Sequence, residues 1–150
     1  MPEMDLERLD RLLSAMPPVA AMAIRVAGFD GEVLRLHAPL AANVNDKDCA
    51  FGGSLASVMT LAGWGWLMLK CAEAGVEAEV YVADSQLRYL APLYADLEGS
   101  ARLAEGEDWP ATLRCLAERG RARVAMRAEV AGTGGPPAAS LQARFALKRA

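Results

Sequence analysis

The chain of 150 residues contains one histidine and three cysteines. The cysteines, Cys49, Cys71 and Cys115, have neither the paired spacing of a disulfide framework nor the short spacing of a zinc site. An odd number of cysteines without a secretory signal peptide indicates a protein of the reducing cytoplasm. These scarcities argue against a zinc enzyme and a disulfide-rich secreted domain, and we expect no bound metal.

Aromatic residues are also few, at 6% of the chain. Nucleic-acid-binding modules commonly interleave aromatic and basic residues, and because no such stripe occurs, we expect no nucleic-acid partner. The net charge of −3 is unevenly distributed: residues 1–100 carry 7 basic and 14 acidic groups, and residues 101–150 carry 9 and 5. The basic residues of the segment 101–150 form either solvated faces or a contact surface for an acidic partner or a phosphorylated ligand.

No charged residue occurs from Cys49 to Leu69, a segment long enough to cross a bilayer. The same segment contains four glycines, two serines and a threonine, and no basic cluster flanks it. We therefore interpret it as a helix buried in a soluble core and expect no membrane partner. The chain length predicts one domain spanning residues 1–150.

Apolar periodicity and turn residues predict an α+β fold, with one antiparallel sheet and a single long apolar helix lying on it. Within the long helix, Gly63 and Gly65 each cost about 1 kcal/mol relative to alanine, which predicts a close approach to the sheet or to a partner helix. The predicted elements are a helix at about 5–15 stopped by Pro17 and Pro18, strands at 21–27 and 32–38 around Asp30-Gly31, the central helix at about 53–74 closed by Gly75, strands at 77–90 and 96–104, a short helix at 110–119, and strands at 121–130 and 140–148.

The polar loop 43–48 leads through Phe51-Gly52-Gly53-Ser54 into the apolar helix. The first N–H groups of a helix have no partner inside the helix, and the helix dipole gives them a partial positive charge. Such a helix start can hold an oxyanion beside an apolar, water-poor pocket.

These residues resemble a known family. The run from Pro39 to Gly65, with Asn43-Val44-Asn45-Asp46-Lys47 and the glycine pair, is similar to the YiiD C-terminal type of hotdog-fold proteins, and Arg88-Tyr89-Leu90-Ala91-Pro92 fits the same fold. The resemblance covers essentially the whole chain. It implies a dimeric hotdog fold, an antiparallel sheet wrapped around one long helix, and an activity on thioesters. Some members of this family decarboxylate malonyl-acyl carrier protein.

The resemblance also implies roles for particular positions. Asn45 would orient the thioester, and the backbone N–H of Gly53 would form the oxyanion hole. A carboxylate commonly stands seven residues after the second glycine, whereas this chain has Thr60 there. Hotdog dimers build their site at the subunit interface, so Thr60 would face Asn45 of the other subunit. The substrate would be bound by Phe51, Gly52, Ser54, Leu61 and Trp64.

Thr60 favours decarboxylation over hydrolysis. Hydrolysis requires an activated water, and a threonine cannot act as its general base near neutral pH. Decarboxylation requires donors aimed at the thioester oxygen, where the enolate charge develops, and Asn45 and Gly53 fit that need. Thr60 could hold the malonyl carboxylate, which an aspartate would repel. Apolar side chains at Phe51, Leu61 and Trp64 would exclude water.

The predicted function is conversion of malonyl-acyl carrier protein to the acetyl thioester and CO₂, which supplies primer for fatty-acid synthesis. The alternatives are a thioesterase acting on acyl-coenzyme A or acyl carrier protein, and a non-catalytic module that binds acyl thioesters. No cofactor is expected beyond the phosphopantetheine that carries the substrate. We expect a homodimer or a dimer of dimers, and Arg121 and Arg123 are candidate contacts for an acidic carrier protein.

Each assigned residue also has a purely structural interpretation. Asn45 could cap the loop, Thr60 could bond its own helix backbone, and Gly53 could be required for space alone. Ser54 fits a helix cap better than a nucleophile, because no base is evident beside it. Two further alternatives remain open: Cys49 with His37 as a nucleophile and base, and Asp46 or Asp48 as a displaced catalytic carboxylate. One of Asp84, Ser85 and Gln86, unusually polar within a strand, could also face the pocket.

Overall fold

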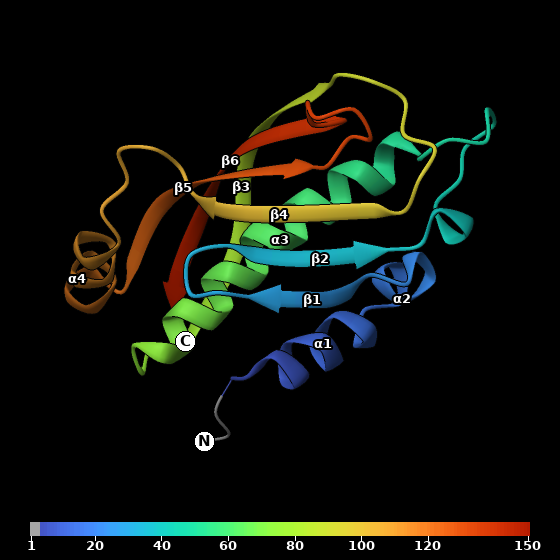
Figure 1. The fold of residues 1–150 in the computed structure, drawn as a ribbon. Coiled ribbons are helices and arrows are strands. Elements are labelled where there is room, and N and C mark those ends of the chain that lie inside the picture. Colours follow the sequence, from blue (N-terminus) through green and yellow to red (C-terminus); the bar gives the residue numbers. More distant parts are fainter. Residues whose placement is uncertain (1–3) are drawn as a thin grey trace.

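The computed structural model describes residues 4–150. Its elements follow one another around a long helix, α3, that the sheet partly encloses (Figure 1). In chain order they are α1 (Leu6–Ala15), α2 (Pro17–Met22), β1 (Arg25–Phe29), β2 (Leu34–Ala38), the 3₁₀ turn η1 (Leu40–Ala42), α3 (Gly52–Glu73), β3 (Ala78–Tyr89), β4 (Leu97–Leu103), α4 (Trp109–Arg119), β5 (Arg121–Val130) and β6 (Ala139–Arg149).

The six strands form one antiparallel sheet in the order β1-β2-β4-β5-β6-β3. Strand β3 follows α3 in the chain but lies at the far edge of the sheet, so both β1 and β3 are edge strands. Helix α3 contacts every strand from β2 to β6 and lies across one face of the sheet (Figure 1). The predicted α+β fold, an antiparallel sheet wrapped around one long central helix, is confirmed.

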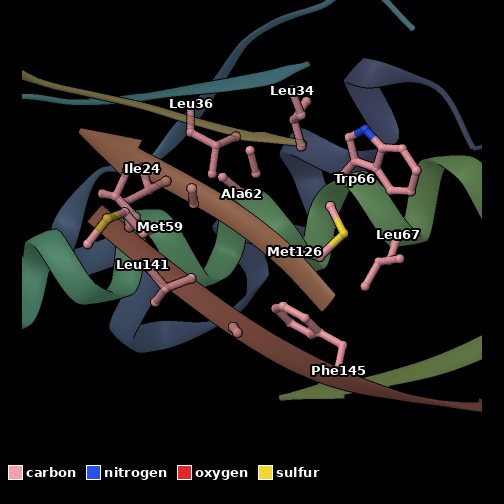
Figure 2. Close-up of a cluster of buried hydrophobic side chains, with 14 of the residues drawn as sticks. Ile24, Leu34, Leu36, Met59, Ala62, Trp66, Leu67, Met126, Leu141 and Phe145 are labelled. Carbon is pink, nitrogen blue, oxygen red and sulfur yellow. The ribbon is translucent and has the colours of Figure 1, made fainter. Parts of the chain in front are cut away.

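The core lies between α3 and the sheet, and its side chains interdigitate there (Figure 2). Met59 and Ala62 of α3 and Phe145 of β6 are fully buried. A Cβ at Gly63 would lie 3.0 Å from the Phe145 ring, and one at Gly65 would lie 2.8 Å from Leu34 Cδ2. The two glycines therefore permit the close helix–sheet approach that the sequence predicts.

The region after the first helix differs from its prediction. Pro17 and Pro18 do not simply end α1, since they also begin a second helix, α2, whose first positions tolerate residues without an N–H. Helix α2 ends at Met22 and is followed by Ala23 in the left-handed conformation, with φ of 54°. The predicted strand 21–27 is therefore wrong over its first residues, and β1 begins only at Arg25.

Helix α3 is long and apolar enough to cross a membrane by length and composition, yet 56% of its most apolar window is buried inside the protein. The core helix of a globular protein meets the same criteria, and the five strands packed on α3 supply that core. The interpretation as a core helix agrees with this packing.

Candidate functional site

One face of α3 is not covered by the sheet. Side chains such as Leu55, Val58 and Met59 are buried, while a second set on the helix stays partly accessible. Residues four, seven, eight and eleven positions apart share one helical face, so the accessible set forms a continuous stripe. It comprises Gly53, Ser57, Thr60, Leu61, Trp64 and Met68. Four of the predicted site residues, Gly53, Thr60, Leu61 and Trp64, are thus brought onto one surface.

The start of α3 leaves backbone donors free. Phe51 occupies the N-cap position in an extended conformation, and no side chain caps the helix. The N–H groups of Ser54 and Leu55 both donate to Phe51 O, at 3.0 Å each. The N–H groups of Gly52 and Gly53 find no acceptor within residues 4–150. The predicted helix cap by Ser54 is wrong, because Ser54 is buried as the third residue of the helix.

Gly53 combines a free N–H with a steric requirement. A Cβ at this position would lie 2.5 Å from Cε2 of the Phe51 ring, which leans over the first turn. Phe51 itself is 54% exposed, so its ring covers the glycine peptide from the solvent side rather than from the core. The structural and catalytic interpretations of Gly53 are therefore compatible: the absent side chain makes room for the ring beside the donor.

Asn45 is held by its own loop. Its Oδ1 accepts hydrogen bonds from the N–H groups of Lys47 at 2.7 Å and Cys49 at 3.1 Å. Its Nδ2 donates to Cys49 Sγ at 3.3 Å, and its backbone N–H donates to Cys49 O at 2.8 Å. Because two backbone donors occupy Oδ1, the carboxamide orientation is fixed and Nδ2 keeps one hydrogen for another acceptor.

Asn43 anchors the base of this loop, a role that the sequence alone did not indicate. Its side chain is buried, and Nδ2 donates to Met22 O and to Pro39 O, both at 2.8 Å. Its carbonyl accepts the N–H of Phe51 at 2.7 Å, directly before the helix. Its Oδ1 is buried without a partner among the described residues. The Asn43-Val44-Asn45 spacing in the sequence is a signal that could have indicated a closed loop. Asn43 holds the base of the loop and Asn45 holds its tip.

Tyr89 is a second residue at the helix start without a predicted role. Its hydroxyl donates to Gly52 O at 3.3 Å, and its ring lies 3.6 Å from where a Gly52 Cβ would be. Tyr89 ends β3 and is 58% exposed. The glycine pair therefore lies between two aromatic side chains, Phe51 from the loop and Tyr89 from the edge strand.

The Thr60 hydroxyl has no hydrogen-bond partner in the described part of the chain. Ser57 on the same stripe bonds its own helix, with Oγ donating to Gly53 O at 2.8 Å. The alternative in which Thr60 bonds its own backbone is therefore not observed, and the hydroxyl is available to a ligand. Thr60 lies seven residues after Gly53, which places it about 10 Å further along the helix axis.

Asp46 and the pair of Cys49 and His37 are not well placed for catalysis. The Lys47 ammonium beside Asp46 lowers the pKa of that exposed carboxyl, which makes it a weaker base. Cys49 Sγ faces Asn45, whereas His37 Nε2 lies 3.1 Å from Asp96 Oδ2, so the two do not form a nucleophile–base pair. Across residues 4–150, no three His, Cys, Asp or Glu side chains are grouped closely enough to hold a metal ion.

The polar residues within β3 point to different sides. Asp84 lies on the outer face of the sheet and pairs with Arg144, whose Nε donates to Asp84 Oδ1 at 2.9 Å. Gln86 lies on the same outer face, opposite Gln142. Ser85 alone of the three alternates toward the face that carries α3.

Comparison with solved structures gives the same architecture over nearly the whole chain. A "putative thioesterase" from Shewanella oneidensis matches with a TM-score of 0.84 and 28% identity, covering 97% of both chains. A protein of unknown function from Chlorobaculum tepidum TLS matches with a TM-score of 0.88 and 25% identity, covering 96% of this chain and 94% of that one.

A Pseudomonas aeruginosa protein described as "Probable Thioesterase" shares the fold, with a TM-score of 0.82 at 22% identity, covering 99% of this chain and 98% of that one. The protein thus has the hotdog arrangement of thioesterase structures. Residues 6–149 match the model of the YiiD_C family, described as "Putative thioesterase (yiiD_Cterm)". The chain therefore belongs to the YiiD_C family of thioesterase-like proteins.

Proposed function

We propose that this protein decarboxylates malonyl thioesters, with malonyl-acyl carrier protein as the substrate and the acetyl thioester and CO₂ as products. The observation that carries the proposal is the neutral stripe on α3. Thr60 presents an unbonded hydroxyl there, and no charged residue occurs between Cys49 and Leu69. A hydrolase would require a group that activates water, and this stripe provides none.

The proposed reaction breaks the bond between the malonyl carboxylate and its α-carbon. The electron pair of that bond moves into the thioester as an enolate, CO₂ leaves, and the α-carbon then takes a proton from water. The charge collects on the thioester oxygen, where donors lower the barrier. The free N–H of Gly53 and the remaining Asn45 Nδ2 hydrogen are donors of this kind.

The spacing along α3 supports a site shared between two subunits. Gly53 and Thr60 are separated by about 10 Å along the axis, whereas the carbonyl oxygen and carboxylate of one malonyl group are much closer together. One helix therefore cannot supply both contacts to one substrate. In a dimer, Thr60 of the second subunit would approach Gly53 and Asn45 of the first.

The exposed apolar side chains support a dimer through β3. This edge strand leaves one row of backbone N–H and C=O groups without a partner strand. Most of the exposed large hydrophobic residues in the described part of the chain lie on β3, on the segment after it, or beside the start of α3. They are Val44, Phe51, Tyr81, Val82, Tyr89, Leu90 and Tyr94. A second copy pairing along β3 would cover this surface and bring the two sites together.

A mass-spectrometric assay with malonyl- and acetyl-carrier protein tests the reaction. We expect malonyl-carrier protein to lose CO₂ and to become acetyl-carrier protein without release of the free thiol. The sharpest control is acetyl-carrier protein, which a decarboxylase leaves intact. Faster release of thiol than of CO₂ would instead identify a thioesterase, and retained but unchanged substrate would identify a binding module.

Thioester hydrolysis is the second candidate. The observation in its favour is that the Shewanella oneidensis protein is described as a "putative thioesterase" and covers the same length at 28% identity. The exposed loop also contains Asp48, whose backbone has a φ of 64° and whose carboxylate is not ion-paired within residues 4–150. If thiol release dominates, Asp48→Asn is the variant that should abolish it.

The basic part of the chain remains the proposed dock for an acidic carrier protein. Arg121 and Arg123 are exposed on the outer face of β5. Replacing both with glutamate should weaken activity on carrier-bound substrate far more than on malonyl-pantetheine, because only the carrier-bound substrate would bring an acidic protein surface to that face. Equal losses on the two substrates would contradict docking at these arginines.

A further inference from the structure

A hollow of about 500 Å³ lies on the outer face of the sheet, where β3, β4, β5 and β6 run side by side. Its charged residues are Arg88, Arg102, Arg127 and Glu129. The remaining polar lining is made of hydroxyl and amide side chains: Ser100, Ser140, Gln86 and Gln142. Such a surface suits a polar anion, and its composition does not suit an acyl chain.

The strand register places like charges opposite each other. Arg102 of β4 pairs directly with Arg127 of β5, and Arg127 in turn lies opposite Gln142 of β6. Directly opposed like charges destabilise a sheet. The arrangement therefore opposes folding unless another group compensates the charge.

Protein carboxylates do not provide that compensation. Arg25, Arg35 and Arg144, which lie on other parts of the strands, pair with Asp10, Asp30 and Asp84 respectively. The side chains of Arg88, Arg102 and Arg127 make no ion pair or hydrogen bond within residues 4–150. With Glu129 as the single acid in the lining, the hollow carries an excess of two positive charges.

The hollow is separate from the thioester site. Strand β5 alternates between buried and exposed residues, with Met126 and Ala128 buried against α3 while Arg127 and Glu129 face outward. Helix α3, which carries the accessible stripe, lies on the other side of the sheet (Figure 1). A ligand in the hollow would therefore not compete with a thioester for space.

We infer that this hollow binds a small phosphorylated anion. Guanidinium groups bind phosphate oxygens with two parallel hydrogen bonds, and three unpaired arginines around one hollow offer several such contacts. The hydroxyl and amide groups supply further donors around the anion. A second copy of the chain is a poor occupant, because pairing this face with itself would oppose two sets of arginines.

Calorimetric titration of the full chain with inorganic pyrophosphate tests the inference. The variant R102Q/R127Q removes the opposed pair, and R11Q/R114Q removes the same charge from exposed positions on α1 and α4. We expect saturable binding to the unmodified protein, a loss of affinity of about tenfold or more in R102Q/R127Q, and little change in R11Q/R114Q.

Thermal unfolding provides the second measurement. R102Q/R127Q should melt at a higher temperature than the unmodified protein when no anion is present, and pyrophosphate should no longer raise that temperature. Equal losses of affinity in both double variants would show that binding is due to general charge attraction and would contradict a specific site in the hollow. An absence of saturable binding at low salt would also overturn the inference. Neither result depends on decarboxylation, so the two proposals fail separately.

Discussion

At the scale of single residues, the candidate site depends on which polar groups are already engaged. The Ser57 hydroxyl donates a hydrogen bond to a carbonyl of its own helix, whereas the Thr60 hydroxyl has no partner among the described residues. Asn45 Oδ1 is occupied by two backbone donors, so only the Nδ2 side of the amide can meet a substrate. The available groups are thus donors and a neutral hydroxyl, which favours stabilising an enolate over activating water.

Replacing Thr60 with aspartate should lower the rate of malonyl decarboxylation by about tenfold or more, because the new carboxylate repels that of the substrate. Quantifying acetyl product by mass spectrometry checks this. Thr60→Val is the matched control, which removes the hydroxyl without adding charge and should cost less. An increased decarboxylation rate in Thr60→Asp would contradict the proposed contact between Thr60 and the malonyl carboxylate.

The sequence pointed to the candidate site residues but not to the residues that support them. Asn45, Gly53 and Thr60 were singled out through the family resemblance, whose motif, the loop followed by the glycine pair and the helix, is continuous in the sequence. The contacts of Asn43 with Met22 and Pro39, and of Tyr89 with Gly52, join segments distant in the chain. The periodicity of apolar residues in the sequence does not predict such contacts, because they form only when the whole chain folds.

At the scale of elements, the central helix depends on small residues where it meets the sheet. Gly63 touches the buried Phe145 ring, and Gly65 lies against Leu34 and Leu9. Close packing at these points lets one helix contact five strands, which fixes the direction of its accessible stripe.

Gly63→Ala should lower the free energy of unfolding by about 1 kcal/mol, because a methyl 3.0 Å from the Phe145 ring forces repacking that exceeds the gain in helix propensity. Urea denaturation measures the change. Phe145→Leu vacates space for the methyl, so Gly63→Ala should cost less in a Phe145→Leu background than in the unmodified chain. A Gly63→Ala protein more stable than the unmodified one would contradict the close packing.

Helix α1 is tied to β1 by Asp10, which accepts bonds from the Arg25 side chain and from Val26 N at 2.8 Å. The Arg25 guanidinium, followed by the Val26 N–H, lowers the pKa of Asp10 below its usual value, although burial opposes this. A carboxyl with a lowered pKa stabilises the folded state above its unfolded pKa, and that contribution disappears as the pH falls through the folded value.

Asp10→Asn should therefore lower the free energy of unfolding at neutral pH by about 1 kcal/mol, a modest figure because Arg25 is largely exposed to solvent. The difference between the two proteins should shrink as the pH falls below about 4. Denaturant unfolding at several pH values checks this. A difference that stays constant from neutral to acidic pH would show that the carboxylate charge is not the cause.

Most elements were predictable because their signals are local. Asp5 caps α1, Gly75 and Gly120 follow α3 and α4 in the left-handed conformation, and along β5 buried residues alternate with more accessible ones. Helix α2 was not predictable in the same way, since Pro17 reads equally well as the end of one helix and the first residue of another. Its six residues are also too few to show a period.

At the scale of the whole molecule, the exposed apolar surface supports the proposed dimer. The apolar residues of β3 and of the α3 entrance are exposed together, and the two halves of the proposed site stand too far apart on one helix. The sequence shows that these residues are apolar, but it does not show that they are exposed together. Whether a strand lies at the edge of the sheet depends on the strand order, which only the structure gives.

Val82→Lys places a charge on the β3 edge and should shift the protein toward monomer while reducing thioester activity in parallel. Sedimentation velocity combined with the mass-spectrometric assay measures both effects. Ala27→Lys on the opposite edge strand, β1, is the matched control and should leave the assembly unchanged. A monomeric Val82→Lys protein with full activity would contradict a shared site.

Asn43 has a consequence for how this molecule opens locally. Its buried side chain binds the last residue of α2 and the residue before η1, while its backbone carbonyl accepts the N–H of Phe51, directly before α3. Segments joined through a common buried group tend to unfold as one cooperative unit. Fluctuations of α2 and of the loop before α3 are therefore coupled, so a mutation that loosens α2 lowers the protection of the loop amides against hydrogen exchange.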